Sequence, residues 1–335
     1  MINPLVRWPG VSADPQGQGG PVVYEMSRPR ALKIKPWRRM KPDVVLLQSW
    51  FNTPRDQVES IIADVRQTRP EAKIVFLDWY APIHLPQPWL FPLVDVYVKK
   101  HVVRDRDRYV QGFHDTNLIE YESQWDESLK PQLEEGVPAQ ALESKLFVGW
   151  NFATDRHLVA KLNQRRYEST SRTIEVHCRL GALHGTPWYR HMRERSLKAV
   201  SALDHQPSIV TSEGVDPARF WDELCQSKAC ISPFGYGEVC WRDFEAIAAG
   251  AILIKPDMSH LETWPNIYQP YQTYVPVKWD FSDLEEQCAW ALASEERRLQ
   301  ICARAVEVWR DYIDRGWTNR LRELNDCLEA ASRME

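Results

Sequence analysis

The residues best suited to chemistry follow the short apolar run from Ala229 to Ser232, which predicts a buried strand. A turn comes next, in which Gly235 and Gly237 flank Tyr236. Glycines let backbone N–H groups approach a ligand, and the helix expected from Glu238 to Ala249 directs its N-terminus at the same point. A strand, a glycine turn and a helix in this order predict a site for an anion.

Three charged residues of the expected helix share one face. At about 100° per residue, Glu238, Arg242 and Glu245 stand at positions i, i+4 and i+7. The guanidinium of Arg242 suits a diphosphate, and a carboxylate of Glu245 or Glu238 can accept hydrogen bonds from paired sugar hydroxyls. A plain surface ion pair between Glu238 and Arg242 is the alternative, but the preceding glycine turn favours a ligand site.

Two further cations are expected at the same edge of the predicted sheet. Arg179 ends the strand predicted over Thr173 to Cys178, and Lys255 ends the strand that follows the helix. The carboxyl ends of parallel strands lie together, so both side chains can reach donor phosphates there. The alternative for Arg179 is a solvated arginine in a loop, and the alternative for Lys255 is a charge at a strand end without a binding role.

The first half of the chain supplies candidates for an acceptor site. Asp78 follows the apolar run Lys73 to Leu77 and is expected at the carboxyl end of a strand, facing a cleft. Trp79 and His84 come just after it and suit the lining of a sugar site. Asp78 is the first candidate for a catalytic base and His84 the second; a turn or cap role is the alternative for either.

Short apolar runs and helical patterns alternate along the chain, which predicts an α/β protein with parallel sheets. In the first half, a helix is expected from Thr53, with Pro54 in its first turn, to Val65. The strands expected in that half are Val22 to Met26, Asp43 to Gln48, Lys73 to Leu77, Val94 to Val98 and a short run from Lys145 to Gly149.

The second half repeats the alternation with shorter connections. A late helix with its own apolar stripe is expected from Asn319 to Ser332. Besides the elements named above, a strand from Ser208 to Thr211, another from Ala251 to Lys255, and helices from Trp188 to Leu203 and from Pro217 to Gln226 are predicted.

Length and composition limit the classes of protein. With 335 residues, the chain is long enough for about two domains. The formal charge of -4 argues against binding nucleic acid, and no apolar run is long enough to cross a membrane, although peripheral membrane contact stays open. The seven cysteines are scattered and form no metal or disulfide pattern, so a cytoplasmic protein with reduced thiols and no metal site is expected.

The stretch from Arg242 to Ile254, which reads Arg-Asp-Phe-Glu-Ala-Ile-Ala-Ala-Gly-Ala-Ile-Leu-Ile, resembles the Arg-x-x-Glu-Ala-x-x-x-Gly-x-x-Pro-Val stretch of exostosin-like and related GT-B glycosyltransferases. The resemblance implies two Rossmann-like domains that face a central cleft, with the donor in the C-terminal one. Arg242 would then contact the diphosphate and Glu245 the ribose. Glu238 is a further candidate for a catalytic residue. Many retaining members carry two glutamates eight positions apart, whereas Glu238 and Glu245 are seven apart, so the role of Glu238 and the stereochemical outcome stay open.

These observations predict a metal-independent glycosyltransferase that moves a sugar from a nucleotide sugar to an acceptor hydroxyl on a carbohydrate, without a cofactor. The expected division is an acceptor domain over residues 1–150, a donor domain over 151–316, and a helix over 317–335 that packs back on the first domain. A nucleotide-sugar epimerase or phosphorylase of the same fold, and a carbohydrate-binding protein without activity, are the alternatives.

Overall fold

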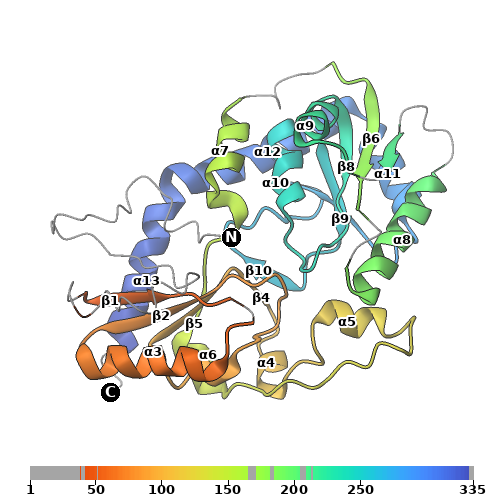
Figure 1. Cartoon of the computed structure of the whole chain (residues 1–335). Coiled ribbons are helices and arrows are strands. Elements are labelled where there is room, and N and C mark those ends of the chain that lie inside the picture. Colours follow the sequence, from red (N-terminus) through yellow and green to blue (C-terminus); the bar gives the residue numbers. More distant parts are fainter. Residues whose placement is uncertain are drawn as a thin grey trace.

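The computed structural model describes residues 38, 42–50, 52–164, 171–181, 185–203, 209–212 and 214–331. The strand expected over Val22 to Met26 lies outside these residues. Two parallel sheets dominate the described part, one in each half of the chain (Figure 1). The alternation of apolar runs and helical patterns therefore predicts the α/β class correctly.

The first sheet has the order β1-β2-β3-β5, and all its neighbouring strands are parallel. Helix α3 lies against it because Val58, Ile61, Ile62 and Val65 form one buried stripe. The N-cap of α3 is Pro54, while Thr53 lies before the helix and accepts a hydrogen bond from the backbone N–H of Trp50. The elements of this half are β1 (Val44–Leu47), α3 (Arg55–Thr68), β2 (Lys73–Asp78), β3 (Val96–Lys99), α4 (Asp107–Gln111), α5 (Asn117–Glu122), α6 (Ala139–Lys145) and β5 (Leu146–Val148).

The second sheet has the order β11-β9-β8-β6-β7 and is also parallel throughout. Both of its faces are covered, so alternate residues of β8 enter different clusters: Ala229 and Ile231 pack on one side and Cys230 on the other. Its elements are α7 (Arg156–Asn163), β6 (Ile174–Arg179), α8 (Pro187–Ser201), β7 (Ile209–Ser212), α9 (Pro217–Cys225), β8 (Ser227–Ile231), α10 (Trp241–Ala249), β9 (Ile252–Pro256), β11 (Val275–Val277), α11 (Leu284–Leu292) and α12 (Glu295–Asp311).

Helix α10 begins later than the sequence predicts. Cys240 is extended and serves as the N-cap, and the carboxylate of Asp243 accepts the backbone N–H of Cys240, so the first helical residue is Trp241. Glu238 therefore lies in the turn before the helix and shares no helical face with Arg242 and Glu245. The helix ends as expected at Gly250, which takes a left-handed conformation with φ 74°.

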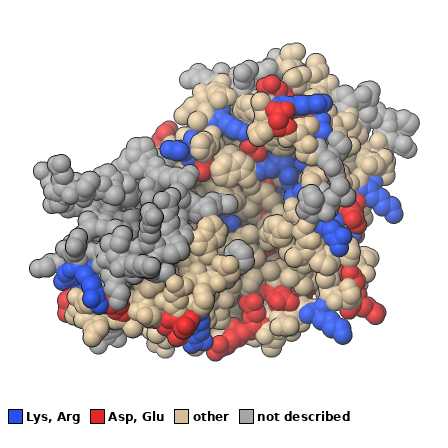
Figure 2. Space-filling view, viewed as in Figure 1, with Lys and Arg blue, Asp and Glu red and all other residues tan. Residues whose placement is uncertain are grey.

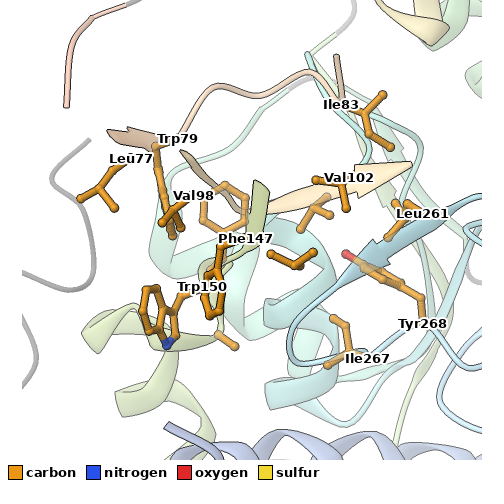
Figure 3. Close-up of a cluster of buried hydrophobic side chains, with 14 of the residues drawn as sticks. Leu77, Trp79, Ile83, Val98, Val102, Phe147, Trp150, Leu261, Ile267 and Tyr268 are labelled. Atoms are coloured by element: carbon orange, nitrogen blue, oxygen red, sulfur yellow. The ribbon is translucent and has the colours of Figure 1, made fainter. Parts of the chain in front are cut away.

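The two halves are joined by a short antiparallel ribbon of β4 (His101–Val103) and β10 (Leu261–Thr263). One hydrophobic cluster runs from the first sheet through this ribbon into the second half; Figure 3 shows it extending from Leu77 and Val98 past Phe147 and Val102 to Leu261 and Tyr268. This ribbon, which the sequence does not predict, fixes the two sheets relative to each other through buried side chains.

The chain returns to its first half at the end. After α12 and a π-helical turn (Tyr312–Gly316), helix α13 (Trp317–Ala331) runs from the second sheet down to the first (Figure 1). It contacts α6 and β3, and Arg320 donates hydrogen bonds to the carbonyl of Val148. The boundaries expected at residues 150 and 316 stay predictions. No helix among the described residues combines the length and apolar character of a membrane span.

Candidate functional site

A cavity of about 1000 Å³ lies between the two halves, where the carboxyl ends of both parallel sheets meet. Its first wall is formed by the segments after β1 and β2, and its second wall by the turn after β8 and the first residues of α10. Figure 2 shows this face of the molecule hollowed between the halves, with basic atoms inside the hollow. Ligands of open α/β proteins bind at such strand ends.

The glycine turn is tightly packed against the opposite wall. A Cβ atom at Gly237 would overlap the carbonyl oxygen of Ala81, so only glycine fits there. Between the glycines, Tyr236 is 48% exposed, and its ring stacks on that of Tyr189 with centroids 4.4 Å apart. Gly235, Tyr236 and Gly237 all line the cavity.

Two arginines, Arg193 and Arg242, reach the cavity. Arg242 of α10 donates hydrogen bonds to the hydroxyl of Ser232 (3.1 Å) and the carbonyl of Pro233 (3.0 Å). Arg193 of α8 donates to the carbonyl of Gly181 (3.1 Å), and its buried Nε has no hydrogen-bond partner within the described ranges. Neither guanidinium pairs with a carboxylate among the described residues. Burial and the charge of Arg242 lower the pKa of Arg193, as expected where one buried cation lies near another.

Glu245 also lines the cavity, and it is partly exposed there. Its carboxylate pairs with Lys161 of α7 at 2.5 Å, and the Lys161 ammonium lies 4.4 Å from the centre of the Trp221 ring. Lys161 holds one carboxylate oxygen, so the other can accept a hydrogen bond from a ligand hydroxyl.

Lys100 is a cavity residue that sequence reasoning missed. It stands between β3 and β4, is 2% exposed, and places its ammonium 4.8 Å from the centre of the Phe152 ring. A signal for it exists in the sequence, because Lys99, Lys100 and His101 interrupt the apolar and aromatic run from Val96 to Val103.

No protein-family model matches this sequence, and no curated protein matches it either. Among solved structures, it is similar to an alpha-glucosyltransferase (AGT) in complex with UDP, at 10% identity over 92% of this chain and 91% of that one, with a TM-score of 0.50. A glycosyltransferase from Rickettsia africae ESF-5 is similar at 11% identity over 92% and 84%, also at 0.50. A third structure, alpha-glucosyltransferase in complex with UDP-glucose and DNA containing an abasic site, is similar at 9% identity over 92% of this chain and 91% of that one, with a TM-score of 0.50. The chain has the GT-B fold.

Within this GT-B fold, Lys255 lies behind the glycine turn and does not reach the cavity. It is fully buried and pairs with Asp243 at 3.2 Å. Asp243 also accepts hydrogen bonds from Ser232 and Tyr268, both at 2.6 Å. This network anchors the turn to α10, so the expected direct contact of Lys255 with a donor is replaced by a supporting position.

Arg179 ends β6 as expected but does not line the cavity. Its guanidinium forms a two-point ion pair with Glu223 of α9, at 2.5 and 2.8 Å. Hydrogen bonds from Arg179 first, and also from Arg219, lower the pKa of Glu223 to about 2. The physical reason is local: α9 places a carboxylate within reach of the strand end, and the pair ties α9 to the sheet.

Asp78 ends β2 as predicted, but it does not face the cavity. It is fully buried, its Oδ2 lies 2.8 Å from the ammonium of Lys99, and the hydroxyl of Tyr97 donates to the same oxygen at 2.8 Å. The backbone N–H of Tyr80 donates to its Oδ1. The neighbouring strand β3 supplies Tyr97 and Lys99, so the carboxylate is held inside the first half and is not among the residues that line the cavity.

Glu238 is likewise fully buried and absent from the cavity wall. Its Oε2 lies 3.2 Å from Nε2 of His101 in β4, and its Oε1 has no hydrogen-bond partner in the described part of the chain. Burial raises the pKa of Glu238 to about 7 and holds that of His101 well below its ordinary value. The pair joins the glycine turn to the ribbon between the halves.

This shift makes a prediction about pH and stability. The pKa of Glu238 is higher in the folded chain, about 7, than its ordinary 4.5, so between these values the folded state binds more protons than the unfolded state. Stability is therefore expected to fall as pH rises through about 7. Glu238→Gln should lose this slope and be more stable than wild type at about pH 8, measured by urea unfolding at several pH values. Identical slopes in both proteins would contradict the assignment.

Trp79 and His84 do line the cavity, on the wall formed by the first half. His84 is 7% exposed and places its Nε2 3.4 Å from a carboxylate oxygen of Glu134, while its buried Nδ1 has no hydrogen-bond partner among the residues that the structure describes. The structure thus brings together Trp79 and His84 with Gly235, Tyr236, Gly237, Arg242 and Glu245. No group of three potential metal-ligating side chains occurs in the part of the chain described here.

Proposed function

We propose that this protein is a glycosyltransferase that takes its sugar from a nucleoside diphosphate sugar. One observation supports this most: Arg193 and Arg242 share a cavity at the strand ends and lack a carboxylate partner among the described residues. Two like charges held together in a partly buried site are unfavourable unless an anion binds between them. A diphosphate has the charge and oxygen geometry that guanidinium groups match.

The remaining residues of the second wall suit the rest of such a donor. The stacked, half-exposed ring of Tyr236 offers a flat face to a base or sugar, and Glu245 offers an acceptor for ribose hydroxyls. The backbone of the Gly235 to Gly237 turn can approach the phosphates closely. We also propose that the enzyme belongs to the exostosin-like group.

In the proposed reaction, the bond between the anomeric carbon and the diphosphate oxygen breaks, and a bond from that carbon to the acceptor oxygen forms. The arginines stabilise the charge that develops on the departing nucleoside diphosphate, which lets the step proceed without a metal ion. The acceptor hydroxyl gives its proton to a base. We assign this role to His84, because it lines the first wall beside Trp79, whereas Asp78 is buried in an ion pair.

Arg242→Ala tests the donor site. The change removes charge-assisted hydrogen bonds to phosphate, so the Kd for the nucleoside diphosphate should rise roughly 10- to 100-fold. Isothermal calorimetry with UDP, ADP and GDP measures this, with thermal unfolding as a check that the variant is folded. Arg304→Ala is the matched control, because Arg304 is an exposed arginine of α12 in a surface ion pair. Unchanged affinity in folded Arg242→Ala would contradict the proposal.

The acceptor is tested separately. A carbohydrate hydroxyl is proposed, and one similar structure contains UDP-glucose and DNA, so the acceptor panel should include oligosaccharides and DNA. Without any acceptor, slow release of nucleotide from a nucleotide sugar indicates a transferase, whereas a sugar of changed configuration indicates an epimerase. Glycan binding without nucleotide binding would favour the carbohydrate-binding alternative.

A further inference from the structure

Lys100 differs from the other buried lysines of the described chain. The exposed fractions of Lys99, Lys100 and Lys255 are 0%, 2% and 0%. Lys99 pairs with Asp78 at 2.8 Å and Lys255 with Asp243 at 3.2 Å. Among the described residues, Lys100 forms neither an ion pair nor a hydrogen bond through its ammonium, whose neighbour is the Phe152 ring. Lys100 alone of the three lines the cavity.

The charges around Lys100 do not compensate its own. Lys99 of β3 repels it, and burial together with that charge lowers the pKa of Lys100 to about 8. The two nearby carboxylates are engaged elsewhere, Asp78 with Lys99 and Glu238 with His101. The facing turn adds the thiol of Cys240. A buried ammonium without a partner is costly, and an anion entering the cavity would remove that cost.

The position of Lys100 gives it a second property. Arg193 and Arg242 come from α8 and α10 of the second half, whereas Lys100 comes from the end of the first sheet. All three side chains line one cavity. An anion placed among them therefore contacts both halves of the molecule.

We propose that Lys100 binds a phosphoryl oxygen of the donor's diphosphate from the half of the molecule opposite the arginines. This inference rests on the proposed function and extends it, because the donor is then held by both walls. Binding fixes a full positive charge on Lys100, so above neutral pH the protein takes up a proton as the diphosphate enters.

Calorimetry with UDP, or with whichever of UDP, ADP and GDP binds most tightly, tests the proposal. Repeating each titration in two buffers of different ionisation enthalpy, from about pH 7 to about pH 9, yields the protons taken up. Wild type is expected to take up a fraction of a proton near pH 8 and to bind more weakly above it. Lys100→Met should bind roughly 10- to 100-fold more weakly and lose the proton uptake.

Two further variants separate charge from structure. Lys100→Arg keeps a positive charge that does not titrate, so it should bind UDP without the pH dependence, even if Lys100→Met fails to fold. Lys228→Met, which removes a lysine from a surface pair with Glu175, should behave as wild type.

The outcomes separate the proposed nucleotide-sugar function from the proposed role of Lys100. If wild type binds no nucleoside diphosphate, the proposed function itself is wrong. If wild type binds and Lys100→Arg retains the same proton uptake, or folded Lys100→Met retains the same affinity, only the role of Lys100 is overturned.

Discussion

Gly237→Ala is expected to destabilise the protein strongly, whereas Gly235→Ala, two residues away in the same turn, should be nearly neutral. A Cβ at Gly237 would overlap the backbone carbonyl of Ala81, and neither backbone can move aside as a flexible side chain could. At Gly235 the nearest atom to a Cβ is the Sγ of Cys240 at 3.5 Å, an ordinary contact. Overpacking against a buried neighbour costs about 1–3 kcal/mol, and a backbone clash belongs at or above the upper end.

Urea unfolding of the two alanine variants measures the difference directly. The same pair reports on function, because the Gly237 turn forms one wall of the cavity and Ala81 the other. A Gly237→Ala protein that still folds should have its walls displaced and bind nucleoside diphosphate more weakly. Equal stability of the two variants would show that the halves do not meet at this point.

Asp78→Asn is the second change with a large expected effect. It leaves the Lys99 ammonium buried without its carboxylate, and breaking a buried pair by removing one partner costs about 3–5 kcal/mol. The matched control is Glu262→Gln, which makes the same acid-to-amide change in an ion pair with Arg106 that is partly exposed. Exposed pairs contribute about 0–1 kcal/mol, so this variant should unfold close to wild type.

Asp78→Asn also decides between two interpretations of that residue. A structural aspartate predicts a loss of stability, visible as a lower urea midpoint with or without substrate. A catalytic base predicts a protein of normal stability that binds donor and no longer transfers sugar. The second result would restore the role that sequence position alone indicates for Asp78.

The sheets were predictable because buried parallel strands give short apolar runs, whereas the helices that cover them have apolar residues three or four positions apart. The start of α10 was not, because the N-cap is decided by one hydrogen bond between Asp243 and the backbone of Cys240. That small difference of three residues moves Glu238 off the helix and into a buried pair with His101. Helical spacing therefore placed Arg242 and Glu245 on the cavity but could not place Glu238.

Ion pairing explains why some strand-end charges do not reach the cavity. Arg179, Asp78 and Lys255 all occupy the expected strand ends, yet each meets an opposite charge from a neighbouring element. Those partners are far away in sequence, so no local pattern reveals them. Arg193 and Lys100 were missed because they are distinguished by the lack of an acidic partner among the described residues, which no local sequence pattern reveals either. Cytoplasmic location and the lack of a metal requirement stay predictions.

The cavity between the halves is proposed to bind a diphosphate through cations that have no carboxylate partner among the described residues. Calorimetry of wild type with a nucleoside, its monophosphate and its diphosphate tests it most directly, since the base and ribose stay constant while the charge increases. Affinity is expected to rise with each phosphate, by roughly tenfold or more from nucleoside to diphosphate, and to weaken as salt is added. Equal affinity for all three ligands, or no binding of any diphosphate, would contradict it.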